Sequence, residues 1–130
     1  MSRIASDGAP RALGPYAQAV VAGDLVFCSG QVGLDPASGA LVPGGIAAET
    51  ARALENLAAV LRAAGLGLRD VVKTTVYLID LGELAAMNEV YGRHFPPPPP
   101  ARATVQVARL PAGARIEIEA VAARGRTPGG

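Results

Sequence analysis

The sequence predicts an α+β fold in which a mixed sheet packs on two helices. Short stretches rich in β-branched residues alternate with two stretches of helical periodicity, in the order ββαβαββ. The 130 residues correspond to one domain, spanning 1–130, without internal repeats or a linker. Half of the residues are hydrophobic, which is enough for one core.

The first half of the chain predicts two strands followed by a helix. Residues 16–21 and 25–32 alternate like strands, and Gly23 lies in the turn between them, where it relieves backbone strain. Apolar side chains recur at roughly helical spacing over residues 46–64, with charged residues between them. Gly65 then provides a stop for this amphipathic helix.

The second half predicts a strand, a helix and two final strands. Residues 71–79 are rich in β-branched side chains, which is typical of a buried strand. Asp80 is an expected N-cap, and Glu83 three residues later completes a variant of the capping box. The prolines from Pro96 onward end this second helix, and residues 100–123 contain the last two strands.

Composition excludes several functional classes. A net charge of +1 without a basic cluster argues against nucleic-acid binding. Cys28 and His94 are the single cysteine and histidine, so an internal disulfide and a zinc or iron cluster are not expected. No apolar run approaches the ~18 residues of a membrane span, and no apolar leader opens the chain. We therefore expect a cytoplasmic protein that does not bind membranes.

Two charged side chains occupy positions where a buried strand is usually apolar. Arg102 follows a run of five prolines, and Glu117 lies between two isoleucines. An arginine matches the planar geometry of a carboxylate, and a carboxylate can orient or deprotonate a water molecule. The pair is consistent with a site where water attacks a small anionic substrate. Two ordinary outward-facing charges remain an equal alternative at this point.

A simple hairpin cannot bring these two charges together. If the last strands turned tightly about residues 111–113, Glu117 would lie opposite Val107, five residues from Arg102. Five residues of strand span about 16 Å, which is too long for one small ligand. Either the two strands are not neighbours, or the two charges meet across a subunit interface.

Five motifs, in order over nearly the whole chain, resemble the Rid family (RidA/YjgF), the reactive-intermediate enamine/imine deaminases. They are Gly14-Pro15-Tyr16, Ser29-Gly30-Gln31, Val72-Lys73-Thr74-Thr75-Val76, Met87-Asn88-Glu89-Val90-Tyr91, and the C-terminal segment with Pro100-Ala101-Arg102, residues 107–111 and residues 116–122. The resemblance implies a chorismate-mutase-like fold whose last strand inserts between other strands. It also implies a homotrimer with its active sites in the clefts between subunits.

The resemblance further implies hydrolysis of 2-imino acids or their enamine tautomers, such as 2-aminoacrylate/2-iminopropionate and 2-iminobutyrate, to 2-keto acids and ammonia. No metal or organic cofactor would be needed. Arg102 would bind the substrate carboxylate, and Glu117 would orient a water and take its proton, with burial raising the pKa of Glu117. The other positions that match the family's cleft are Tyr16, Ser29, Gly30, Gln31 and Asn88.

One position departs from many family members. Thr104 stands two residues after the arginine, where a cysteine is common. A contribution through the backbone carbonyl would survive this change, whereas a thiol role would not, so the change bears on substrate range. The proline run Pro96–Pro100 is longer than the usual family connection and is expected to be a stiff connector to Arg102.

Three other functions are alternatives to the deaminase. A ribonuclease fits poorly, because the chain has no basic patch and no histidine in any motif. A protein that binds a keto acid without turnover would need Arg102 but not Glu117, so the presence of Glu117 favours an enzyme. An enamine deaminase dedicated to one catabolic pathway remains open.

Overall fold

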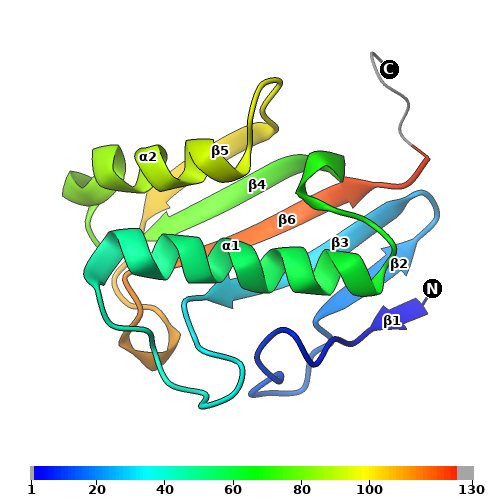
Figure 1. Cartoon of the computed structure of the whole chain (residues 1–130), viewed down its shortest axis with the longest axis horizontal. Coiled ribbons are helices and arrows are strands. Elements are labelled where there is room, and N and C mark those ends of the chain that lie inside the picture. Colours follow the sequence, from blue (N-terminus) through cyan, green and yellow to red (C-terminus); the bar gives the residue numbers. More distant parts are fainter. Residues whose placement is uncertain (1, 126–130) are drawn as a thin grey trace.

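The computed structural model describes residues 2–125 as a six-stranded mixed sheet with two helices on one of its faces (Figure 1). The elements, in chain order, are β1 (Ser2–Ile4), β2 (Ala19–Ala22), β3 (Leu25–Val32), α1 (Gly45–Ala63), β4 (Val71–Leu78), α2 (Leu84–His94), β5 (Ala101–Gln106) and β6 (Ile116–Ala123). The strands lie in the order β1-β2-β3-β6-β4-β5, and β4 and β5 pair parallel while all other pairs are antiparallel. The predicted α+β class is therefore confirmed. Neither helix is long and apolar enough to cross a membrane.

The beginning of the chain differs from the prediction. An additional edge strand, β1, pairs with β2, and β2 begins at Ala19 rather than at Tyr16. Strand β2 begins late because the buried side-chain amide of Gln18 forms hydrogen bonds with the backbone of Ser6 and of Pro10, which hold the preceding segment as a loop. Tyr16 therefore lies in a loop.

The second helix also begins differently. Asp80 caps a short 3-10 turn, Leu81–Glu83, by accepting a hydrogen bond from the Gly82 amide at 2.8 Å, and α2 starts only at Leu84. The predicted cap is confirmed, but the predicted capping box is wrong. The Glu83 carboxylate instead accepts a hydrogen bond from Arg115 at 3.2 Å.

Strand β6 fixes the architecture, because it inserts between β3 and β4 (Figure 1). Its side chains alternate between two environments. Ile116, Ile118, Ala120 and Ala122 are buried in the core against the helices. The residues between them point to the other side, which we call the open face of the sheet. The open face is formed by Phe27, Lys73, Thr75, Tyr77, Glu117, Glu119 and Val121.

Candidate active site

The Glu117 carboxylate lies directly over the backbone of Gly30 on the open face. Strand β3 has a bulge here, because the three steps from Cys28 to Gln31 face only two steps of β6. A Cβ atom placed on Gly30 would lie 2.8 Å from the carboxyl carbon of Glu117, closer than real Cβ atoms come. Only glycine at position 30 leaves room for the carboxylate in this position.

A cavity of about 270 Å³ lies beside this carboxylate. Four of the predicted site residues line it together: Tyr16, Gly30, Gln31 and Glu117. Its remaining wall comes mainly from the loop before β2 and from β3, through Pro10, Arg11, Ala12, Leu13, Gln18, Val32, Leu34 and Pro111. A largely apolar cavity with a few polar groups is typical of a small-molecule site.

Ser29, the fifth predicted residue of this region, shapes the wall rather than lining the cavity. Its hydroxyl donates a hydrogen bond to the carbonyl of Ala17 at 2.6 Å, and its amide donates to the carbonyl of Gln18 at 2.9 Å. Both bonds fasten the bulged part of β3 to the loop that carries Tyr16.

The environment of Glu117 favours its protonated form. Burial removes water from the carboxylate, and the nearby Glu119 adds like charge, so the pKa of Glu117 is raised above its ordinary value. Glu119 itself accepts a hydrogen bond from the Tyr77 hydroxyl at 2.7 Å. A raised carboxyl pKa suits a group that takes a proton and gives it back near neutral pH.

Arg102 lies on the other side of the sheet. It pairs with Thr74 of β4, and its guanidinium carbon lies 4.8 Å from the centre of the Tyr91 ring, on α2. Tyr91 is buried and shares a 2.6 Å hydrogen bond between its hydroxyl and that of Thr74. The Phe95 ring lies 4.7 Å from the Tyr91 ring, centre to centre. Arg102 is therefore held on a fixed aromatic surface.

Asn88 and Thr104 belong with Arg102. Thr104 is two residues further along β5, so its side chain points to the same side of the sheet. Asn88 is exposed on α2, three residues before Tyr91 and hence on a neighbouring part of the helix surface.

The structure thus divides the predicted site residues into two groups. Tyr16, Gly30, Gln31 and Glu117 line the cavity beside the open face, and Asn88, Arg102 and Thr104 lie at the helix-bearing side. Strand β4 separates β5 from β6, so the two strands do not form the hairpin considered above. One protomer does not bring Arg102 and Glu117 together.

Two residues that contribute to the site were not predicted from the sequence. Tyr91 supports Arg102, and Glu119 raises the pKa of Glu117. Glu119 could have been found from the repeated Ile-Glu pattern, which places both glutamates on one face. Cys28 is buried in the core, and burial raises its pKa to about 12, in agreement with a packing role.

Comparison with known proteins places this chain and its fold in one family. The family model described as Endoribonuclease L-PSP matches residues 6–124. Protein DfrA of Myxococcus xanthus is 54% identical over 92% of this chain and 92% of its own length. The 2-iminobutanoate/2-iminopropanoate deaminase of Mus musculus is 52% identical over 94% of this chain and 90% of its own length.

Solved structures agree with the sequence matches. RidA from the Antarctic bacterium Psychrobacter sp. PAMC 21119 is 45% identical and superimposes with a TM-score of 0.91 over 95% of this chain and 99% of its own. The chain belongs to the Rid (RidA/YjgF) family. It is an enzyme of the Rid deaminase type.

Proposed function

We propose that this protein hydrolyses small 2-imino acids, or their enamine tautomers, to 2-keto acids and ammonia. The observation that carries the proposal is the position of Glu117, a half-buried carboxylate of raised pKa held over Gly30 at the wall of a small cavity. The mouse relative, named for 2-iminobutanoate and 2-iminopropanoate, supports substrates of three and four carbons.

In the proposed reaction, Glu117 takes a proton from a water molecule as the water oxygen bonds to the imine carbon. The same carboxyl group passes this proton to the nitrogen, which gives a carbinolamine. The hydroxyl proton of the carbinolamine then moves through Glu117 to the amino nitrogen. The C–N bond breaks, ammonia leaves, and the C–O bond becomes the keto carbonyl.

Arg102 binds the substrate carboxylate in this scheme through two parallel hydrogen bonds. Because Arg102 and Glu117 point to opposite faces of one sheet, we propose that Arg102 comes from an adjacent subunit of a homotrimer. Two features support this assembly. Strand β5 is an edge of the sheet and is largely exposed, and Phe27 leaves 45% of its surface exposed on the open face. Asn88 and Thr104 would then enter the same site beside Arg102.

The description of the family model as an endoribonuclease raises a second activity, which this chain supports poorly. RNA binding relies on clusters of positive charge, and the net charge here is +1 without such a cluster. A protein that binds keto acids without turnover needs Arg102 but does not need Glu117 as a proton acceptor.

Subunit complementation tests both the chemistry and the shared site. Arg102→Ala removes the group that binds the substrate carboxylate, and Glu117→Gln removes the proton acceptor. Each variant alone should lose turnover of 2-iminopropionate generated in situ. Glu117→Gln should lose roughly 10²–10⁴-fold in rate while retaining keto-acid binding, because it removes only the proton acceptor. Arg102→Ala should lose both turnover and keto-acid binding.

Co-expression of the two variants should restore activity. In a closed trimer formed at random from equal amounts, about a quarter of all sites combine an intact Glu117 with an intact Arg102 from the neighbour. Recovery of roughly that fraction of the wild-type rate supports the shared site. Zero recovery from proven mixed trimers contradicts it, and a wild type that never exceeds the buffer rate contradicts the deaminase.

A further inference from the structure

Arg11 is a second cation beside the proposed reaction cavity. It lines the same 270 Å³ space as Glu117 and Tyr16, and it lies on the loop before β2. Within residues 2–125, the Arg11 side chain forms no ion pair with a carboxylate. Its charge is therefore available to a ligand.

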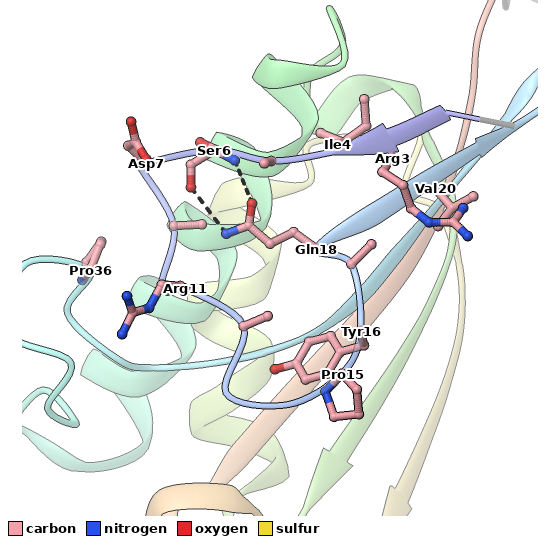
Figure 2. A pocket seen from close by; sticks show the side chains of 14 residues that line it. Arg3, Ile4, Ser6, Asp7, Arg11, Pro15, Tyr16, Gln18, Val20 and Pro36 are labelled. Carbon is pink, nitrogen blue, oxygen red and sulfur yellow. Dashed lines mark hydrogen bonds between the residues drawn. The ribbon is translucent and has the colours of Figure 1, made fainter.

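The loop that carries Arg11 is held in place by Gln18. The buried Gln18 amide accepts a hydrogen bond from the Ser6 backbone at 2.5 Å, and it donates to the Pro10 carbonyl at 2.9 Å. Pro10 directly precedes Arg11, so the backbone of Arg11 starts from a fixed point. Figure 2 shows this arrangement, with the Gln18 bonds to Ser6 and with Arg11 and Tyr16 on the same loop.

Arg11 also lines a second, larger cavity of about 810 Å³, which is shown in Figure 2. The two cavities share Arg11, Ala12, Tyr16 and Gln18 as a common wall. A ligand that extends from the smaller cavity toward the larger one therefore passes this shared wall, which includes Arg11. Arg3 lies at the opposite end of the larger cavity in Figure 2 and does not line the smaller one.

The smaller cavity holds more than the proposed three-carbon substrate. A volume of 270 Å³ is many times the roughly 10–15 Å³ that one water molecule needs. The α-carboxylate of the substrate is already assigned to Arg102, so Arg11 has no partner in the reaction of a simple alkyl imine. Glu117 is the one carboxylate among the described residues that line this cavity, and burial raises its pKa above the ordinary value.

We infer that Arg11 binds an acidic side chain of the substrate, so that this enzyme favours imino acids with a second carboxylate, such as the imines of aspartate and glutamate. The inference rests on the proposed function for the reaction itself. Arg11 determines the substrate specificity, because its guanidinium binds the side-chain carboxylate. Arg102 binds the α-carboxylate, and Glu117 accepts and donates the proton.

The test compares two stable keto acids by calorimetry: 2-oxoglutarate, with a second carboxylate, and 2-oxobutyrate, without one. The wild type should bind 2-oxoglutarate more tightly. In Arg11→Gln this preference should shrink at least tenfold, because a charge-assisted hydrogen bond is lost for one ligand only. Arg11→Lys should keep part of the preference. Arg3→Gln, the matched control, should keep all of it.

Turnover of the imines of glutamate and 2-aminobutyrate, produced in situ by an amino-acid oxidase, gives a second readout of the same ratio. The inference is overturned if the wild type binds both keto acids equally, or if Arg11→Gln weakens both to the same extent. The outcomes separate the two proposals. If the protein shows no turnover but prefers 2-oxoglutarate in an Arg11-dependent way, the deaminase proposal is wrong and the Arg11 subsite stands. If turnover is normal but this preference is absent, the deaminase proposal stands and the Arg11 subsite is wrong.

Discussion

At the scale of single residues, one hydrogen atom at Gly30 determines where the Glu117 carboxylate can lie. A methyl group there would lie 2.8 Å from the carboxyl carbon, so Gly30→Ala should push the carboxylate out of its position. Because the carboxylate ends a flexible side chain, it can swing aside, and the fold should survive. We expect at least a tenfold loss of kcat with an unchanged circular-dichroism spectrum.

Gly67→Ala is a matched control for this substitution. Gly67 has an extended backbone, and a Cβ there meets no atom within 4 Å. This variant should therefore keep the wild-type rate. A Gly30→Ala enzyme as fast as the Gly67→Ala enzyme would show that the observed position of Glu117 is not the one used in turnover.

The raised pKa of Glu117 also predicts a stability effect. A carboxyl group whose pKa is higher in the folded than in the unfolded protein destabilises the fold where it is ionised, and this cost disappears below the unfolded pKa. Glu117→Gln should thus raise Tm at pH 7. The gain should decrease as the pH falls and vanish near pH ~4, where an unfolded glutamate takes up its proton. Thermal unfolding across this range measures it, and an equal Tm at pH 7 would contradict the raised pKa.

At the scale of elements, the contact between α2 and β5 presents Arg102. The Tyr91 ring lies under the guanidinium, and the Tyr91 hydroxyl is bonded to Thr74. Tyr91→Leu removes the ring and should weaken keto-acid binding, since a cation–π contact contributes about 0.5–2 kcal/mol.

Tyr91→Phe separates this binding role from a packing role. It keeps the ring but leaves the Thr74 hydroxyl buried without its partner, which costs about 1–3 kcal/mol of folding stability. We expect near-normal binding by calorimetry and a lower Tm. Equal binding losses in the leucine and phenylalanine variants would show that the aromatic surface does not position Arg102.

At the scale of the whole molecule, the open face predicts assembly. Phe27 is 45% exposed there, next to the apolar side chain of Val121. Sedimentation velocity at micromolar concentration should give three times the monomer mass of 13.1 kDa. Phe27→Asp should shift the protein toward monomers and abolish turnover, because obligate interfaces bury apolar surface.

Leu81→Asp serves as the control for this variant. Leu81 is 42% exposed, like Phe27, but it lies in the turn before α2 and not on the open face. It should leave the sedimenting mass unchanged. A wild type that sediments as a monomer would remove the basis for a site shared between subunits.

Much of the fold could be predicted from local patterns. The helix predicted over residues 46–64 agrees with α1 to within one residue at each end, and the strand predicted over residues 71–79 agrees with β4 to within one residue, because periodicity and β-branched composition act locally. The same patterns missed β1, which has only three residues and exists through its pairing with β2.

The sequence by itself determined the family, the two charged candidates and the α+β class, since these depend on residue identity and short-range order. The resemblance also led us to expect an inserted last strand. Only the tertiary structure identified β3 and β4 as the neighbours of β6, placed Glu117 over Gly30, and showed that Arg102 points to the other face. Strand partners are chosen among segments far apart in the chain, through the packing of a shared core. A local sequence pattern does not predict whether two side chains far apart in the sequence will lie on the same face of the sheet.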